Sequence, residues 1–126
     1  MPMTFLALCI GAVLGTLLRY GLAEAFNAVF PTLPLGTLAA NLFGGFLMGI
    51  AIAMIMAYPQ WPIAARLGVT TGFLGGLTTF STFSAESFLL LQRGQYAAAL
   101  AHTAAHVLGA LGCVALGFAL GRLFAR

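Results

Sequence analysis

The third apolar segment of this chain carries the sequence GFLGGLTTFSTFSAES at residues 72–87. Gly75 and Gly76, followed by Thr78 and Thr79, form helices poorly, yet they lie near the middle of a stretch that is apolar enough to cross a bilayer. Irregular backbone is tolerated at that depth only inside protein or beside a water-filled or ion site. Two alternatives follow: an unwound turn whose carbonyl oxygens suit an alkali cation, or an intact helix that uses its glycines for packing.

The composition of the whole chain indicates that lipid surrounds most of its surface. Of 126 residues, 62% are hydrophobic and 6% are charged, and the mean hydropathy is +1.08. A soluble domain carries about 25% charged residues. All five cations are arginines scattered along the chain, so a basic patch is missing and no nucleic-acid partner is expected. The partner that composition predicts is the lipid bilayer.

Four apolar stretches reach the length of about 20 residues that a helix needs to cross the hydrocarbon core. They cover residues 4–25, 35–57, 63–91 and 96–123. Backbone groups in lipid must be satisfied within their own segment, so each stretch is predicted to be a helix. We predict an all-α membrane protein, a single domain over residues 1–126, with four transmembrane helices of which the third is broken.

The arginines hardly select an orientation in the membrane. Positively charged residues normally accumulate in cytoplasmic loops. Here Arg66, Arg122 and Arg126 fall on the side of the N-terminus, and Arg19 and Arg93 fall on the other. We therefore expect insertion in both orientations, for which an antiparallel homodimer is the natural assembly. The alternative is that one arginine, or the lipid, still decides the orientation.

Helical spacing after the break groups aromatic and hydroxyl side chains on one arc. These residues are Phe80, Phe83, Ser84 and Ser87, with Thr79, Thr82 and Glu86 on the adjoining stripe. The edge of a phenylalanine ring is electropositive, so two ring edges with hydroxyl donors nearby could hold an anion weakly enough to release it. The alternative is that paired phenylalanines simply pack.

Polar residues in the other spans also leave alternatives. Asn41, midway along the second span, could donate into a polar pathway or join two helices by hydrogen bonds. His102 and His106 lie four residues apart and could ligate a metal, but no third ligand follows at suitable spacing, so a polar track or a satisfied interior pair fits better. Arg19 and Glu86 lie near the ends of their spans, where they either snorkel or form a charged vestibule.

The motif GGLTTFSTFS at residues 75–84 resembles the Fluc (CrcB) family of fluoride channels. The likeness extends to residues 11–20 and 36–41 and to the four-span layout, so it covers essentially the whole chain. The resemblance implies a fluoride-selective, passive ion channel in the inner membrane of a bacterium. Such a channel is a dual-topology, antiparallel homodimer that exports fluoride through two pores.

The resemblance also implies roles for individual residues. Phe80 and Phe83 match the phenylalanine pair whose ring edges face the fluoride path, and Asn41 matches the pore asparagine. Gly75 and Thr78 match the break whose backbone carbonyls hold a structural sodium ion at the dimer interface. Ser81 and Thr82 match hydroxyls near the fluoride path, His106 would fall on a polar track of the fourth span, and Arg19 matches a basic residue at the vestibule. Two further expected site residues come from sequence position alone: Ser84, from its helical spacing near the fluoride path, and Glu86, at the vestibule.

Two other functional hypotheses fit the sequence less well. A small multidrug-type, proton-coupled exporter would need a carboxylate in the middle of its first helix, and Glu24 lies at the very end of the first span. A purely structural membrane protein would account for the glycines but would leave Asn41 and the cluster of threonine, serine and phenylalanine without a purpose. An enzyme is not expected, because no catalytic acid, nucleophile or nucleotide-binding loop is apparent.

Overall fold

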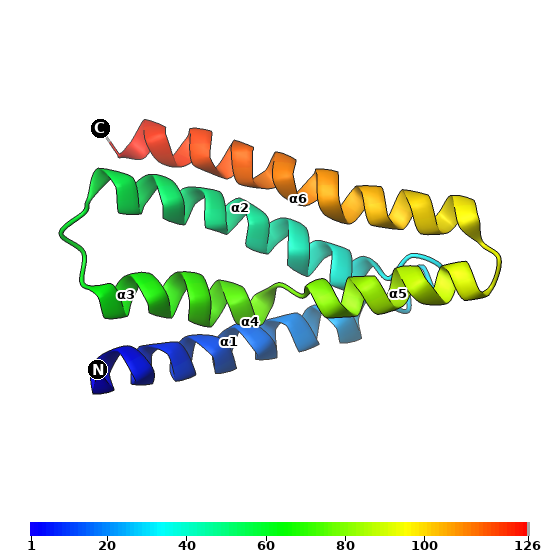
Figure 1. Ribbon diagram of the computed structural model, residues 1–126, viewed down its shortest axis with the longest axis horizontal. Helices are drawn as coiled ribbons and strands as arrows, with labels where there is room; N and C mark the ends of the chain where they lie inside the picture. The colour runs from blue at the N-terminus through cyan, green and yellow to red at the C-terminus, as the bar shows by residue number, and fades with distance from the viewer. Residues whose placement is uncertain (126) are drawn as a thin grey trace.

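The computed structural model describes residues 1–125, and the elements that it contains are helical (Figure 1). They are α1 (Pro2–Phe26), α2 (Leu35–Ala57), α3 (Ile63–Leu67), the π-helical segment η1 (Gly68–Leu74), α4 (Gly75–Leu77), α5 (Phe80–Gln92) and α6 (Tyr96–Phe124). The predicted fold class, a four-span helical membrane protein with a broken third helix, is confirmed. Arg126, which entered the orientation argument, lies outside the described residues.

Three of the crossings are continuous helices. By length and composition α1, α2 and α6 can each span a membrane. The remaining crossing, the third in chain order, is the run from α3 to α5, which is interrupted at Thr78 and Thr79. Both termini and the α2–α3 loop lie at one end of the bundle, and the α1–α2 and α5–α6 loops lie at the other (Figure 1). Among the described arginines, this places Arg66 and Arg122 toward one end and Arg19 and Arg93 toward the other.

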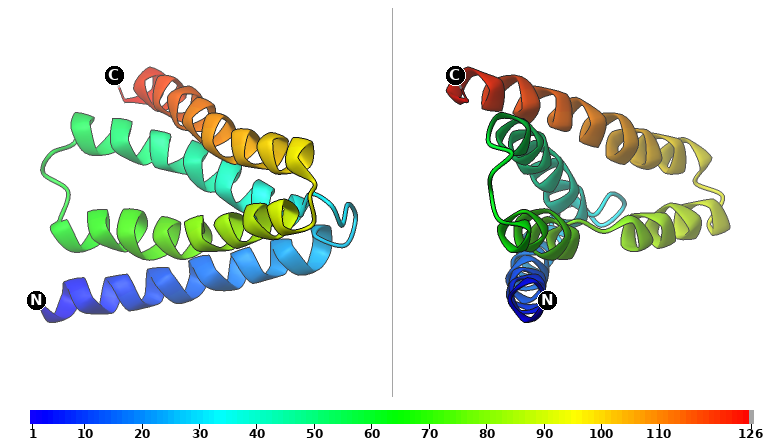
Figure 2. Two further views of the ribbon diagram at one scale, coloured as in Figure 1. Left: turned by 45° about the vertical axis from the view of Figure 1, so that its right-hand side comes forward. Right: turned by 60° about the vertical axis from the view of Figure 1, so that its left-hand side comes forward.

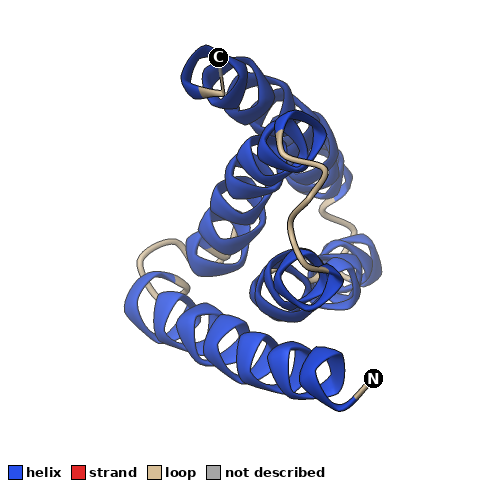
Figure 3. Cartoon of the chain, turned by 90° about the vertical axis from the view of Figure 1, so that its left-hand side faces the viewer, coloured by secondary structure: helices blue, strands red, loops and turns tan. Residues whose placement is uncertain are grey.

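The helices pack in two main pairs. α2 packs along α6, while α1 packs along the first half of the broken crossing, through α3, η1 and α4. The end-on view of Figure 3 and the oblique views of Figure 2 show α1 and α6 on opposite sides of the molecule, with α2 crossing obliquely between them. α5 leaves the α1 side after the break and packs on α6.

Glycines allow these pairs to approach closely. A Cβ added to Gly15 of α1 would overlap the carbonyl oxygen of Phe73 in η1. In the second pair, a Cβ added to Gly117 of α6 would overlap the carbonyl oxygen of Phe46 in α2. Lipid provides no hydrophobic force between helices, so backbone proximity of this kind supplies much of the packing energy.

The third crossing is unwound at its middle, which decides between the two alternatives that the sequence left open. Thr78 has φ −88° and ψ 153°, and Thr79 has φ −147° and ψ 111°, both extended. The side-chain oxygen of Thr79 then caps α5 by accepting a hydrogen bond of 3.1 Å from the Thr82 amide. This local bond restarts the helix at Phe80.

Candidate functional site

Asn41 of α2 holds the break in the third crossing. Its Nδ2 donates to the Thr79 carbonyl at 3.0 Å, and its Oδ1 accepts from the Thr79 amide at 2.7 Å. The extended Thr79 has no helical partners for its amide and carbonyl, and the side chain of Asn41 satisfies both groups. From the other side, Arg19 of α1 donates its Nε to the carbonyl of Gly76 at 2.9 Å.

The carbonyl oxygens of the turn before the break, those of Gly75 and Thr78 among them, lose the partner that a continuous helix would give them. The Thr79 amide, which would bond the Gly75 carbonyl, donates to Asn41 instead. The Thr82 amide, which would bond the Thr78 carbonyl, donates to the Thr79 side chain. The carbonyls of Gly75 and Thr78 are thus free of their usual helical bonds and are hard oxygen donors of the type that prefers hard cations.

The two phenylalanines of the motif differ in their surroundings. Their ring centroids are 4.8 Å apart and their planes are nearly perpendicular, at 88°. Phe83 is 7% exposed, and its ring stacks on His106 with a centroid distance of 4.8 Å. Phe80 is 77% exposed and projects from the bundle beside the break.

An open groove of about 390 Å³ connects these residues. Its lining comes from α2, the break, α5 and α6, and consists of Asn41, Gly44, Gly45, Met48, Thr78, Thr79, Phe80, Phe83, His106, Val107, Ala110 and Val114. The structure therefore brings Asn41, Phe80, Phe83 and His106 to one site. Their side chains offer an amide, two ring edges and an imidazole, and none of them carries a permanent charge.

A smaller cavity of about 210 Å³ lies on the α1 side of the break. It is lined by Thr16, Arg19, Tyr20, Ala23, Asn27, Thr37, Thr79 and Thr82. Thr79 lines both this cavity and the groove, so only the break separates the Arg19 side from the Phe80 side. Arg19 is the charged residue that lines this cavity. A cationic side chain at a vestibule would lie in such a position.

The remaining hydroxyl residues of the motif lie around the Thr79 side chain. Thr79 Oγ1 donates to Thr82 Oγ1 at 2.9 Å and lies 3.4 Å from Ser81 Oγ. Ser81 is exposed and Thr82 is half-buried. Ser84 is half-buried as well, but it lies outside the linings of both cavities.

Glu86 lies inside the bundle rather than at an open vestibule. Thr37 of α2 donates to its Oε1 at 2.7 Å, and its Oε2 lies 3.1 Å from Nε2 of His102. The His102 and His106 rings are 4.5 Å apart, and Nδ1 of His106 is 2.9 Å from Nδ2 of Asn41. A chain of polar side chains thus runs from Thr37 to the break.

Two residues of this polar row, Thr37 and Thr79, were not predicted as site residues from the sequence. Thr37 precedes Asn41 by one helical turn, and this spacing was the signal that could have joined it to the site. Thr79 gave no such signal, because its role depends on its extended backbone. Asn27 was also missed; its Oδ1 accepts from the Thr37 amide at 3.1 Å and ties the α1–α2 loop to the start of α2.

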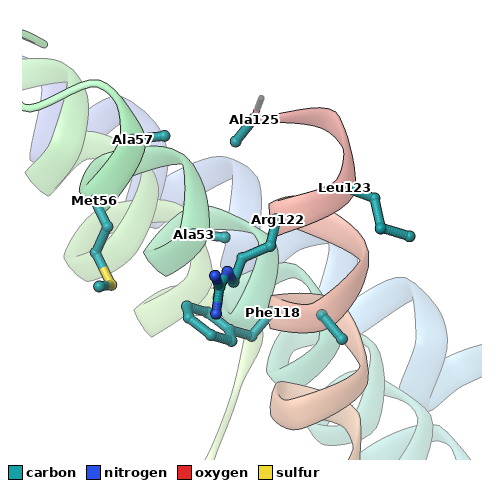
Figure 4. A pocket seen from close by; sticks show the side chains of 8 residues that line it. Ala53, Met56, Ala57, Phe118, Arg122, Leu123 and Ala125 are labelled. Carbon is teal, nitrogen blue, oxygen red and sulfur yellow. The ribbon is translucent and has the colours of Figure 1, made fainter.

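A third cavity, of about 650 Å³, lies elsewhere and is a poorer candidate for the functional site. It lies between the ends of α2 and α6, where alanines, Met56 and Leu123 form much of the lining and Arg122 sits over the Phe118 ring at 5.9 Å (Figure 4). Arg122 is the single charged residue among its described lining residues. An arginine near a helix end, with its stem on apolar surface, is the ordinary snorkelling arrangement.

These features define a multi-pass helical membrane protein with a polar, uncharged site at a break in one helix. The family model described as CrcB-like protein, Camphor Resistance (CrcB), matches residues 6–118. The chain therefore belongs to the CrcB family, which confirms the resemblance seen in the sequence.

Close relatives come from several bacteria. A protein of Bordetella bronchiseptica named fluoride-specific ion channel FluC is 50% identical over 125 residues, which is 99% of this chain and 96% of the relative. Proteins with the same name are 50% identical in Cupriavidus pinatubonensis, over 98% of both chains, and 54% identical in Chromohalobacter salexigens, over 94% of this chain and 90% of the relative. The chain is accordingly a multi-pass bacterial membrane protein.

Proposed function

We propose that this protein is a fluoride-selective channel that lets fluoride leave the cell passively across the inner membrane. The observation that carries the proposal is the convergence of Asn41, Phe80, Phe83 and His106 on one groove beside a broken helix. The relatives named as fluoride-specific ion channels, which match nearly the whole chain, support the choice of ion.

The groove offers fluoride several weak contacts in place of water. One N–H of Asn41 is held by the Thr79 carbonyl, while the other faces a ring nitrogen of His106. The second N–H can pass from the ring nitrogen to a fluoride ion without breaking the bonds that hold the break. The edge of Phe80 adds a positive quadrupole contact. Neutral contacts bind an anion weakly enough for it to move on, which conduction requires.

We infer that the conducting unit is an antiparallel homodimer with two pores. The 77% exposed ring of Phe80 and the open groove form an incomplete site in one chain, and a second copy would close it. The described arginines, two toward each end of the bundle, set no preferred orientation. In a two-fold dimer of oppositely inserted copies, both subunits use the same surface patch at the interface. Such a dimer would therefore contain two equivalent grooves, one from each copy.

We further propose that a sodium ion stabilises this dimer. The Gly75 and Thr78 carbonyls would hold it, since neither has its usual helical partner. Two copies would supply four hard oxygen donors, which suits an alkali cation better than a transition metal. The ion would join the two breaks and would take no part in moving fluoride.

A proton-coupled exporter finds no support in the structure. Glu24 lies near the end of α1, and Glu86 is engaged by Thr37 and His102. Neither acid lies at the middle of the first helix, where that mechanism needs one.

Ion efflux from liposomes tests the proposal. Vesicles with the purified protein should release fluoride rapidly and chloride slowly. Phe83→Ile should abolish fluoride efflux, because it removes the ring that stacks on His106, while gel filtration should still show a dimer. Phe88→Ile, an exposed ring on the same helix that lies outside the groove, is the matched control and should conduct normally. Tight wild-type vesicles, or full efflux with Phe83→Ile, would refute the pore.

A further inference from the structure

The interior cluster of Glu86, His102 and His106 has a feature that anion conduction does not use. One ligand atom from each residue lies within 4.8 Å of the others. The sequence offered only the two histidines of α6 as metal ligands, and the fold brings the missing third from α5. We propose that these three residues form a binding site for a divalent transition ion such as Zn²⁺.

The cluster has unused ligand atoms in the right places. Within the described residues, Glu86 Oε2, His102 Nε2 and His106 Nε2 are buried without a hydrogen-bond partner of acceptable geometry. His102 is 2% exposed and His106 is 3% exposed. Buried polar atoms almost always have partners. Two of these atoms, Glu86 Oε2 and His102 Nε2, face each other at 3.1 Å, and Nε2 of His106 has no partner at all among residues 1–125. One ion bound by all three atoms would satisfy the whole cluster.

The distances are close to those that zinc needs. Two ligands at a tetrahedral zinc, with bonds of about 2.0–2.1 Å, lie about 3.3 Å apart. Nε2 of His102 and Oε2 of Glu86 are already 3.1 Å apart. The ligand atoms of the cluster are at most 4.8 Å apart, so His106 would have to move inward by up to about 1.5 Å to reach this spacing. Two histidines and one glutamate, with water as the fourth ligand, are a known zinc ligand set.

A neighbouring side chain already orients one ligand, and a hydroxyl pair joins the two helices that carry the cluster. Thr37 donates to Oε1 of Glu86 and leaves Oε2 free. Ser87 and Thr103, each adjacent in sequence to a ligand, join α5 to α6 through hydroxyls 2.9 Å apart. Outer-shell bonds of this kind fix ligand direction and strengthen metal binding. Glu86, whose side chain is 16% exposed, is the least buried ligand, so an ion would enter from its side.

Metal binding would oppose the bond between Asn41 and His106. Asn41 presents Nδ2, a donor, to Nδ1 of His106, so that nitrogen accepts and the ring proton is on Nε2. A metal on Nε2 requires the proton to move to Nδ1, where it would face the Asn41 donor. The Zn²⁺-bound state therefore loses this bond.

Calorimetry and cobalt spectroscopy test the site on the purified, untagged protein. One Zn²⁺ should bind per chain, and Co²⁺ should give the intense visible bands of tetrahedral coordination. Glu86→Gln and His102→Gln should each weaken binding at least about tenfold, and Thr37→Val by about 10–100-fold. Glu24→Gln, which removes the other acid, and a variant with both cysteines replaced by alanine should bind like the wild type.

Each outcome decides the proposal once gel filtration shows that the variants keep the wild-type size. The proposal would be overturned if the wild type binds no zinc at millimolar concentration or if its cobalt spectrum is octahedral. It would also be overturned if Glu86→Gln and His102→Gln bind zinc as tightly as the wild type. Unchanged affinity in His106→Gln would overturn the assignment of His106 as the third ligand. Zinc should also block fluoride efflux, but this result alone rests on the proposed function. If the protein binds zinc yet conducts no fluoride, the channel fails and the metal site stands.

Discussion

Replacing Asn41 by leucine should destabilise the protein strongly, because this one side chain bridges three otherwise separate elements. It makes two bonds to the Thr79 backbone, of 3.0 and 2.7 Å, and a third contact of 2.9 Å to His106. Leucine has the same branched arrangement of heavy atoms and is not smaller, so little of the effect should come from a cavity.

The size of the loss can be set from these contacts. A hydrogen bond between membrane helices averages about 0.6 kcal/mol and reaches about 1.7 kcal/mol. Three of them give about 2–5 kcal/mol. The upper half of this range is expected, because the buried amide and carbonyl of Thr79 would be left without partners. Because Thr79 is extended, no helical hydrogen bond can replace the bonds that its backbone loses.

Equilibrium unfolding in mixed micelles, followed by circular dichroism at one protein concentration, measures the change in the free energy of unfolding. Thr70→Val is the matched control, since Thr70 bonds the Arg66 carbonyl of its own helical run at 2.8 Å and joins no second element. Its effect should stay within about 0.5 kcal/mol. If Asn41→Leu proves no more harmful than Thr70→Val, Asn41 does not hold the break.

Three further outcomes are expected. Arg19→Gln should lower fluoride efflux several-fold at 0.01 M ionic strength and much less at 1 M, since salt screens an accessible charge; equal effects at both ionic strengths would exclude an electrostatic role. A single cysteine at Gln95, in a background without other cysteines, should react with an impermeant maleimide in about half of the chains of sealed cells, and labelling of all or none would rule out dual topology. Gly117→Ala should destabilise the α2–α6 pair because its Cβ meets the Phe46 carbonyl, whereas Gly112→Ala, which meets open space, should be neutral or stabilising by up to about 1 kcal/mol; similar thermal stability of the two variants would contradict the packing.

Features encoded locally could be predicted from the sequence. The four crossings follow from the lengths of apolar runs. The residues Gly75–Thr79 indicated where a break could form, but the local sequence also allowed an intact helix, and the unwound turn depends on Asn41 of α2. The π-helical segment from Gly68 to Leu74 was not predicted. It lies along α1, where Gly72 meets the backbone of Leu8, so its geometry depends on a helix that is distant in sequence.

In the candidate site too, contacts within one helix could be predicted, whereas contacts between helices could not. Phe80 and Phe83 were grouped by spacing within one helix, and the structure finds their rings 4.8 Å apart. The contact between Glu86 and His102 joins α5 to α6, and no periodicity within either helix reveals it. Glu86 was placed at a vestibule because it lies toward the end of its span, but tertiary packing turns it inward to Thr37.

The role of Asn41 affects how variants of this site should be interpreted. An extended turn at mid-membrane exposes backbone groups that lipid cannot satisfy, and Asn41 supplies the partners that make the turn possible. The same amide borders the proposed fluoride path. Loss of flux in an Asn41 variant would therefore follow either from a missing donor or from a collapsed break. Phe83 has no hydrogen-bonding side-chain group and makes none of the bonds that hold the break, so Phe83→Ile should leave the break intact. This variant therefore tests conduction separately from the fold that Asn41 maintains.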